Sequence, residues 1–312
     1  MIEIIEGKPH IRPCRSIPAD GNELNDWVAS ISTLYEPLTT MMPLAGAPML
    51  LPDRPGGEPR IAARLRAEAP WMGAAIDLVA DQAAMSLWAG RPWLSLRPML
   101  LVGPPGAGKT HFARRLGELS ACGNAVLSLA GVSSNAELAG NPRGFRHQQP
   151  CFPACVIQAT GKANPVVVID EVEKACAGLA GDPVATLLGM LERSTASRFF
   201  DGCLAAEVDI GHVNWILTAN SIARLPAPLL SRLQVVEVPG PAPEHAEIVL
   251  ATLWRDVARD LGLAPAALPR LEAAAEAQLL RLFRNTRSVR RLRRAIETVV
   301  AVSARHAPRA VN

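Results

Sequence analysis

The sequence predicts an α/β fold, in which a three-layer domain with a parallel sheet is followed by a small helical lid domain. Short apolar runs, among them residues 99–102 and 166–170, alternate with segments of helical periodicity. The run at 166–170, VVVID, is apolar on both faces, as a central parallel strand requires. No strand signal follows the PGPAPE segment at 239–244, so the remainder of the chain is expected to be helical.

Length and composition exclude several classes of protein. The 312 residues are 49% hydrophobic and 20% charged, which suits a globular chain with a sizeable core. A net charge of +3 is too close to balance to indicate nucleic acid or a membrane surface by itself. No apolar run reaches the roughly 18 residues that a membrane helix needs, and the first residues lack the apolar core of a signal peptide. We therefore expect a cytoplasmic protein with no membrane partner, and interpret its six scattered cysteines as thiols.

The α/β domain is expected at residues 61–240. Residues 1–60 are rich in proline and glycine, show no sustained period of helix or strand, and are predicted to be an extension. Residues 61–89 are Ala-rich, with one apolar helical face. Beyond them we expect a helix at 111–119 and strands at 99–102, 125–129, 166–170 and 214–218.

The helical lid domain, expected at residues 241–312, has two apolar faces. In both, apolar residues recur at the three- and four-residue spacing that places side chains on one side of a helix. The first face comprises Ala246, Val249, Leu250, Leu253, Trp254, Val257 and Leu261. The second comprises Val289, Leu292, Ile296, Val299 and Val300.

The segment GPPGAGKT, Gly103–Thr110, fits the phosphate-binding pattern G-x-x-x-x-G-K-[ST] and lies between an apolar strand and a helix, as that pattern requires. Its glycines let backbone N–H groups close around phosphates. Lys109 would reach the β- and γ-phosphates, and the Thr110 hydroxyl would ligate Mg²⁺. A glycine-rich turn with an incidental lysine is the alternative, which the complete pattern disfavours. The predicted ATP-binding residues are Gly103, Pro104, Pro105, Gly106, Ala107, Gly108, Lys109, Thr110 and His111.

Two adjacent carboxylates, Asp170 and Glu171, end the run at 166–170, at the edge where open α/β sheets bind ligands. Asp170 is predicted to hold the magnesium shell together with Thr110. Glu171 is predicted to orient or polarise the water that attacks the γ-phosphate. The alternative is a solvated loop after a core strand, and the phosphate-binding pattern elsewhere in the chain argues against it.

Three segments, GPPGAGKT, VVVIDEVEK and ILTANSIARLPAPLLSRLQVVEV, together resemble the ATPase module of Lon-type proteases, within the AAA+ superfamily. The resemblance covers about residues 98–302. It implies the AAA+ fold, ATP and ADP as ligands, Mg²⁺ as cofactor and hydrolysis of ATP. It also implies a homo-oligomeric ring, which is a hexamer in this family.

The same resemblance implies three further site residues. Asn220, in NWILTAN, is similar to the sensor-1 residue between the carboxylates and the γ-phosphate. Arg232, in PAPLLSRL, is similar to the arginine finger that reaches a neighbouring subunit's nucleotide, a role that suits its planar charged fork. Arg290 is similar to the lid arginine that contacts the nucleotide. Its competitors are Arg287, Arg291, Arg293 and Arg294, and the register of Val289, Leu292 and Ile296 favours Arg290.

Two departures from the family shape the expected function. No segment matching the Lon peptidase serine and lysine follows the lid, so no peptidase activity is expected. The loop that carries a polypeptide-gripping aromatic residue in Lon has Gln148 and Gln149 at the matching positions. Phe145 or Phe152 is the candidate substitute, with core or loop packing as the alternative. Slow or undetectable threading of a polypeptide is therefore expected.

The leading hypothesis is a stand-alone AAA+ ATPase that hydrolyses ATP at subunit interfaces and remodels an unidentified protein client. The alternative is a nucleic-acid-associated factor, because residues 281–309 carry nine arginines and a single acid. A solvated helix face is preferred, because Phe283 is the one aromatic residue there to stack on bases. A third hypothesis, a nucleotide-switched scaffold without rapid turnover, is disfavoured by Glu171 and Arg232.

Overall fold

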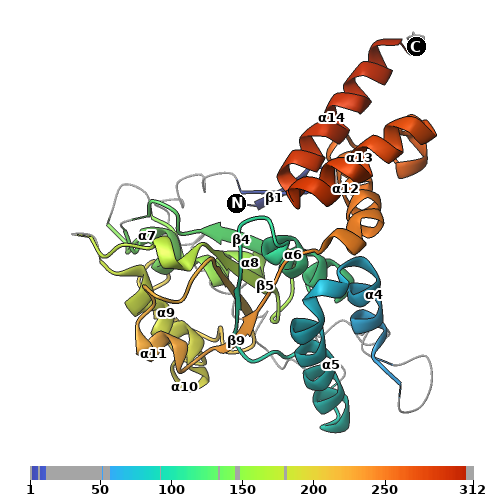
Figure 1. The fold of residues 1–312 in the computed structure, drawn as a ribbon. Coiled ribbons are helices and arrows are strands. Elements are labelled where there is room, and N and C mark those ends of the chain that lie inside the picture. The colour runs from blue at the N-terminus through green and yellow to red at the C-terminus, as the bar shows by residue number, and fades with distance from the viewer. Residues whose placement is uncertain are drawn as a thin grey trace.

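The computed structural model describes residues 2–5, 8–11, 51, 57–91, 93–132, 134–144, 148–178 and 181–306. An α/β domain is followed by a helical lid that stands at one end of it (Figure 1). Five parallel strands form the central sheet in the order β4-β5-β8-β3-β9. Their bounds are β3 Met99–Val102, β4 Asn124–Ser128, β5 Val166–Asp170, β8 Asn214–Ala219 and β9 Gln234–Glu237. The predicted α/β fold with a parallel sheet and a helical lid is thus confirmed.

Helices cover both faces of the sheet, because successive side chains of a strand point to opposite faces. On β5, Val167 and Ile169 pack in one core, and Val166 and Val168 pack in the other. The first core is covered by α7 (Ala136–Ala139), α8 (Phe152–Thr160) and α9 (Pro183–Leu191). The second is covered by α4 (Arg60–Glu68), α5 (Gly73–Trp88) and α6 (Lys109–Leu119). β5 is an inner strand of the sheet, between β4 and β8, and a helix-covered core lies on each of its faces. Its run is therefore apolar on both faces.

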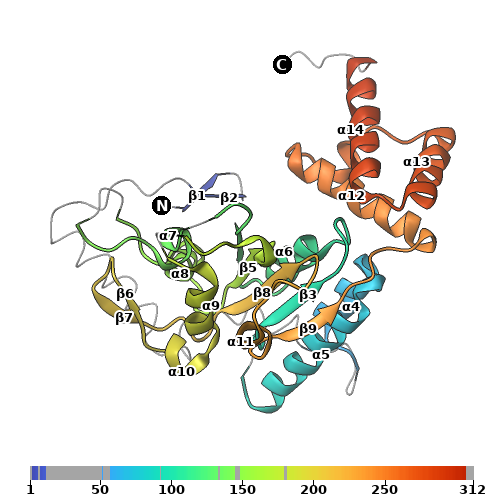
Figure 2. The ribbon, with the colours of Figure 1, turned by 60° about the vertical axis from the view of Figure 1, so that its left-hand side comes forward.

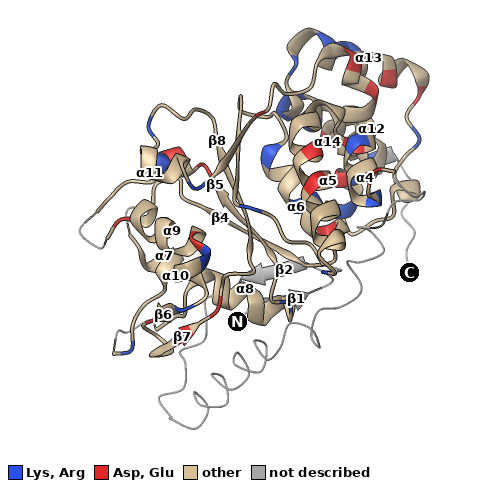
Figure 3. Ribbon diagram, turned by 90° about the horizontal axis from the view of Figure 1, so that it is seen from below, with Lys and Arg blue, Asp and Glu red and all other residues tan. Residues whose placement is uncertain are grey.

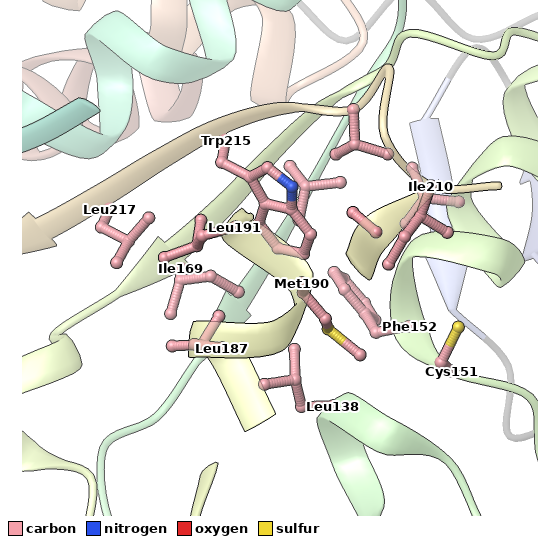
Figure 4. Close-up of a cluster of buried hydrophobic side chains, with 14 of the residues drawn as sticks. Leu138, Cys151, Phe152, Ile169, Leu187, Met190, Leu191, Ile210, Trp215 and Leu217 are labelled. Carbon is pink, nitrogen blue, oxygen red and sulfur yellow. The ribbon is translucent and has the colours of Figure 1, made fainter. Parts of the chain in front are cut away.

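The first core contains one of the residues considered for gripping polypeptide. Phe152 is buried beside Met190 and Ile210, close to the indole of Trp215 (Figure 4). Of the two alternatives for Phe152, the structure shows core packing, because its ring is part of the packing that joins α8 to the sheet. Phe145, the other candidate, lies outside the described residues.

Several elements differ from the sequence-based expectation. Residues 61–89 form two helices, α4 and α5, because Pro70 cannot continue the first and is followed by a short 3-10 helix, Pro70–Met72. Residues 1–60, predicted to lack strands, contain the antiparallel pair β1 (Ile2–Ile5) and β2 (Lys8–Ile11). A second hairpin and two short helices were not predicted: β6 Phe199–Asp201, β7 Ala206–Val208, α10 Arg193–Ala196 and α11 Ala227–Leu230.

The lid consists of α12 (Ala246–Asp260), α13 (Ala273–Thr286) and α14 (Val289–His306), which pack around the buried Phe283 (Figure 2). Leu261 was predicted on the first apolar face but is 54% exposed, because α12 ends one residue earlier. The domain boundaries near residues 60 and 240 stay a prediction.

The described surface carries mixed charge. Arginines predominate on α4 and α14, whereas the two charged residues of α5, Asp77 and Asp81, are acidic (Figure 3). Among the described residues, no helix is long and apolar enough to cross a bilayer, and none of the cysteines there forms a disulfide.

Candidate nucleotide-binding site

A pocket of about 330 Å³ lies where the parallel strands end. It is formed by the turn after β3, the residues after β5, the end of β8 and the first turn of α14. Its lining is Pro105, Gly106, Ala107, Gly108, Lys109, Thr110, His111, Asp170, Glu171, Lys174, Thr218, Asn220, Val289 and Arg290. The structure therefore brings most of the sequence-predicted residues together. Gly103 and Pro104 lie in the same turn behind the lining, and Arg232 lies elsewhere.

The loop between β3 and α6 needs its glycines for two different reasons. Gly106 and Gly108 have φ of +82° and +93°, a region that residues with a Cβ rarely adopt. Gly103 instead lies against the backbone after β9, and a Cβ on it would fall 2.1 Å from the carbonyl oxygen of Val238. The loop is thus held tightly against the neighbouring strand.

Replacing Gly103 with alanine is expected to destabilise the protein. The added Cβ would force apart two backbone segments, at a cost of about 1–3 kcal/mol in the free energy of unfolding. Gly189→Ala is the matched control, because a Cβ there meets no neighbouring atom and alanine is favoured inside a helix by about 0.5–1 kcal/mol. Thermal unfolding should show a lower Tm for the first variant and an unchanged or higher Tm for the second. Equal shifts would contradict the close approach of Gly103 and Val238.

Lys109 is buried at the centre of the loop. Its ammonium donates hydrogen bonds to the carbonyl oxygens of Gly103 at 2.7 Å and Pro104 at 3.1 Å. It also donates to Asn220 Oδ1 at 3.2 Å. Burial is the main cause that lowers the pKa of Lys109 below its ordinary value, and nearby carboxylates, Glu173 foremost, oppose that shift. The ammonium thus joins the phosphate loop to the end of β8.

Thr110 and Asp170 place two oxygen ligands side by side. The Thr110 hydroxyl donates to Asp170 Oδ1 at 2.8 Å. The Thr218 hydroxyl, from β8, donates to the same carboxylate oxygen. Mg²⁺ prefers hard oxygen ligands such as hydroxyl and carboxylate groups. The Thr110 hydroxyl, at the start of α6, and the Asp170 carboxylate, at the end of β5, therefore fit the predicted metal site.

Glu171 follows β5 directly in a left-handed conformation, with φ of +57°. Its backbone N–H donates to the Thr218 hydroxyl at 3.2 Å, which fixes this turn against β8. Its Oε1 lies 2.7 Å from Lys174 Nζ, an ion pair that sequence reasoning did not predict. Any water that Glu171 polarises must therefore compete with Lys174 for this carboxylate.

Asn220 connects Lys109 to a second acid that the sequence analysis missed. The backbone N–H and the side-chain amide of Asn220 both donate to Glu173 Oε1, at 2.9 and 2.8 Å. Glu173 Oε2 is buried and has no hydrogen-bond partner among the described residues. Glu173 reaches β8 because the residues after β5 form a 3-10 turn, Val172–Lys174, which folds back toward the sheet.

The two predicted arginines lie in different places. Arg290 is exposed at the start of α14 and lines the pocket. Of its competitors, Arg293 forms ion pairs within the lid, to Asp260 at 2.6 Å and Glu297 at 2.8 Å. Arg232 lies outside the pocket: its Nε is 3.4 Å from Glu192 Oε2, and its Nη1 donates to the Pro228 carbonyl at 3.0 Å. The nucleotide roles of both arginines stay predictions.

Sequence reasoning also missed the contacts between the loop and the lid. The Trp71 indole donates to the Ala107 carbonyl at 2.9 Å and lies 5.4 Å, centroid to centroid, from the ring of His245. His111 Nδ1, in α6, lies 3.4 Å from Asp256 Oδ2, in α12. Trp71 precedes the loop by more than 30 residues and carries no motif, so only the folded chain reveals its position.

Several known proteins are similar to this chain in sequence or in fold. Residues 99–239 match the family described as "ATPase family associated with various cellular activities (AAA)". A mitochondrial Lon protease homologue of Phaeodactylum tricornutum is 35% identical over 204 residues, which cover 64% of this chain and 23% of that protein. A Lon protease of Clostridium beijerinckii is 39% identical over 140 residues, which cover 45% of this chain and 18% of that protein. The chain thus spans about a fifth to a quarter of the length of these relatives.

A solved structure supports the fold. The chain aligns with a structure titled "Closed State CryoEM Reconstruction of Hsp104:ATPyS and FITC casein", with a TM-score of 0.57 and 17% identity, over 76% of this chain and 45% of that one. At this identity the likeness concerns the fold alone. Together, the comparisons confirm the resemblance seen in the sequence: residues 99–239 match the AAA family, and this part of the chain is similar to Lon proteases.

Proposed function

We propose that the chain binds Mg-ATP in the pocket at the phosphate loop, hydrolyses it at the interface between copies in a ring, and thereby remodels a protein partner. The observation that carries the proposal is the hydrogen bond between Thr110 and Asp170 beside the ammonium of Lys109. A metal ligand pair, a phosphate-binding cation and a candidate base, Glu171, line one pocket.

The residues of the pocket divide the work of phosphoryl transfer among them. Lys109 would exchange its bonds to the loop carbonyls for bonds to phosphate oxygens. Thr110 and Asp170 would hold Mg²⁺, which neutralises charge on the phosphates. Glu171 would orient the attacking water, and Asn220, held by Glu173, would keep its amide beside Lys109. These assignments agree with the roles that the family resemblance implies.

Arg232 supports the part of the proposal that concerns a ring. Its guanidinium lies beside Glu192 and does not line the pocket of its own chain. An arginine that completes catalysis from there has to act on a neighbouring copy. We propose a hexamer by family resemblance, and a protein client of unidentified sequence.

The nucleic-acid alternative is weakened by the pairing of the lid arginines. Arg293 is neutralised by Asp260 and Glu297, and Arg284 lies 3.5 Å from Glu247. Two arginines of the cationic segment at 281–309 therefore form ion pairs with acidic residues of the same lid. Arg309 lies outside the described residues.

Removal of Mg²⁺ tests the proposed site. We expect ATP hydrolysis to stop in excess EDTA and to return when Mg²⁺ is added, because the phosphate charge is otherwise not neutralised. Asp170→Asn should raise the Mg²⁺ concentration that half-restores turnover by about 10-fold or more, the size expected for one charged ligand. Asp81→Asn, at an exposed position of α5, should leave it unchanged. Phosphate release at a fixed ATP concentration is the measurement, and turnover that persists in EDTA would contradict the proposal.

A further inference from the structure

A second pocket, of about 400 Å³, lies at the opposite end of the sheet from the phosphate loop. It is lined by Leu96 and Pro98, just before β3, and by Val213 and Trp215, where β8 begins. Residues of α5, of the end of α9 and of α10 complete it. In Figure 2, α5 and α10 lie on the lower side of the molecule, away from the lid. None of the predicted nucleotide residues reaches this pocket.

The rim of this second pocket is cationic. Arg91, Arg97 and Arg193 line it, and no aspartate or glutamate does. Within the described chain, none of these three guanidinium groups forms an ion pair with a carboxylate. Burial lowers the pKa of His212, which also lines the pocket, and the charges of Arg193 and Arg91 lower it further against the opposing Asp209. His212 thus lines the same pocket as Arg91 and Arg193.

Part of the lining of the second pocket is apolar. Its floor includes the buried side chains of Trp215 and Leu191. Met85 lines the pocket and is 60% exposed, and Trp88, three residues further along α5, is 91% exposed. Large exposed side chains of this kind, together with arginine, are typical of protein interfaces and of their energetic centres.

We propose that this pocket is a docking site for an acidic segment of a partner protein. A bulky apolar side chain of the segment enters the pocket, and carboxylates on either side of it bind Arg91, Arg97 and Arg193. Trp88 and Met85 cover the apolar parts of the segment outside the pocket. The complementary charge identifies the occupant, because arginine forks bind carboxylates in bidentate geometry and no carboxylate of the pocket lining competes for them.

A nucleic acid fits this surface less well. Non-specific binding of a phosphate backbone needs many cations along a groove. Here only three arginines line one cavity of about 400 Å³, together with apolar side chains such as Trp215 and Leu191, and they form no extended cationic groove. The nucleotide pocket of the same chain lies at the opposite end of the sheet, whereas Arg232 lies near the second pocket, because its ion-pair partner Glu192 stands between the lining residues Leu191 and Arg193.

The test uses the full chain and two fluorescein-labelled peptides of ten residues. One carries a central tryptophan flanked by glutamates, and its twin carries glutamine in place of every glutamate. Fluorescence anisotropy should show binding of the acidic peptide and at least 10-fold weaker binding of its neutral twin. The variant Arg91→Ala, Arg193→Ala should weaken binding of the acidic peptide by about 10-fold or more, the size expected for charged hydrogen bonds. The control is Arg64→Ala, Arg305→Ala, at exposed positions of α4 and α14, and it should bind like the wild type.

A second variant tests whether the cavity itself is needed, without any change in its charge. Ala89→Trp places a large ring at the exposed edge of the pocket and removes no cation, so it should also weaken binding of the acidic peptide about 10-fold. Unchanged thermal unfolding and ATPase activity in each variant would show that the fold and the nucleotide site are intact. Equal binding by wild type, pocket variants and control would overturn the proposal. So would tighter, pocket-dependent binding of a 20-nucleotide single strand, or self-association that the pocket variants abolish.

Discussion

Replacing Lys109 with alanine is expected to abolish ATP binding, whereas replacing Glu171 with glutamine should leave binding intact and stop turnover. Lys109 is the buried cation at the centre of the phosphate loop, and its loss leaves the phosphate charge without a side-chain partner there. Glu171 lies where β5 ends and is proposed to act on water, and its amide analogue would retain the shape of the site but not the charge. A positioned base contributes about 10²–10⁴-fold to a rate, which sets the expected loss of turnover.

Two measurements check this expectation. Calorimetry with a slowly hydrolysed ATP analogue gives the Kd, and phosphate release gives the turnover rate. Glu276→Gln, an exposed acid of α13, is the matched control for loss of one carboxylate and should behave as the wild type. If wild type and Glu171→Gln turn over ATP at the same rate, the assignment of Glu171 is wrong.

Replacing Arg232 with alanine should lower turnover by about 10³-fold or more, the size found for arginines that stabilise phosphoryl transfer from a neighbouring chain. ATP affinity should change little, because Arg232 does not line the pocket of its own chain. The ATP dependence of assembly, followed by light scattering, should show oligomers in the wild type. Arg305→Ala, which removes an exposed arginine of α14, is the control and should retain activity.

A mixing experiment tests the shared interface directly. Arg232→Ala and Glu171→Gln chains should each be inactive alone. In a mixed ring, some interfaces pair an intact Glu171 on one chain with an intact Arg232 on the next, so a fraction of the wild-type rate should return. A strictly monomeric protein with full activity, unaffected by Arg232→Ala, is incompatible with this mechanism.

Most strands of the sheet could be predicted, because β3, β5 and β8 are short, apolar and almost completely buried. β9 was not expected, because its short run QVVE has polar ends and is only partly buried. The strands expected at 166–170 and 214–218 agree with β5 and β8 to within one residue. A strand that helices cover on both faces is a continuous apolar run, which is visible in the sequence. The β6–β7 hairpin was not found, because strands of three residues give no periodic signal. The break between α4 and α5 was signalled by Pro70, which was outweighed by the alanine-rich composition around it.

The site was predictable where its residues are adjacent in the chain. The phosphate loop and the carboxylates after β5 are contiguous motifs, so their chemistry is visible in the sequence. Glu173, Thr218 and Lys174 act through contacts between separate segments or through the turn that the chain makes after β5. Phe152 shows that residue type alone does not predict position, because a phenylalanine in a pore loop and one in a core look the same in the sequence.

Trp71 connects the phosphate loop to the start of the helical lid. One indole ring contacts the carbonyl of Ala107 in the phosphate loop and the ring of His245 at the root of the lid. If ATP shifts the position of the lid through this contact, then thermodynamic reciprocity requires a load on the lid to shift the affinity for ATP by the same free energy. A partner that displaces the lid would then change the affinity of the chain for ATP, with Trp71 as one of the contacts, beside the His111–Asp256 pair, that connect the lid to the α/β domain.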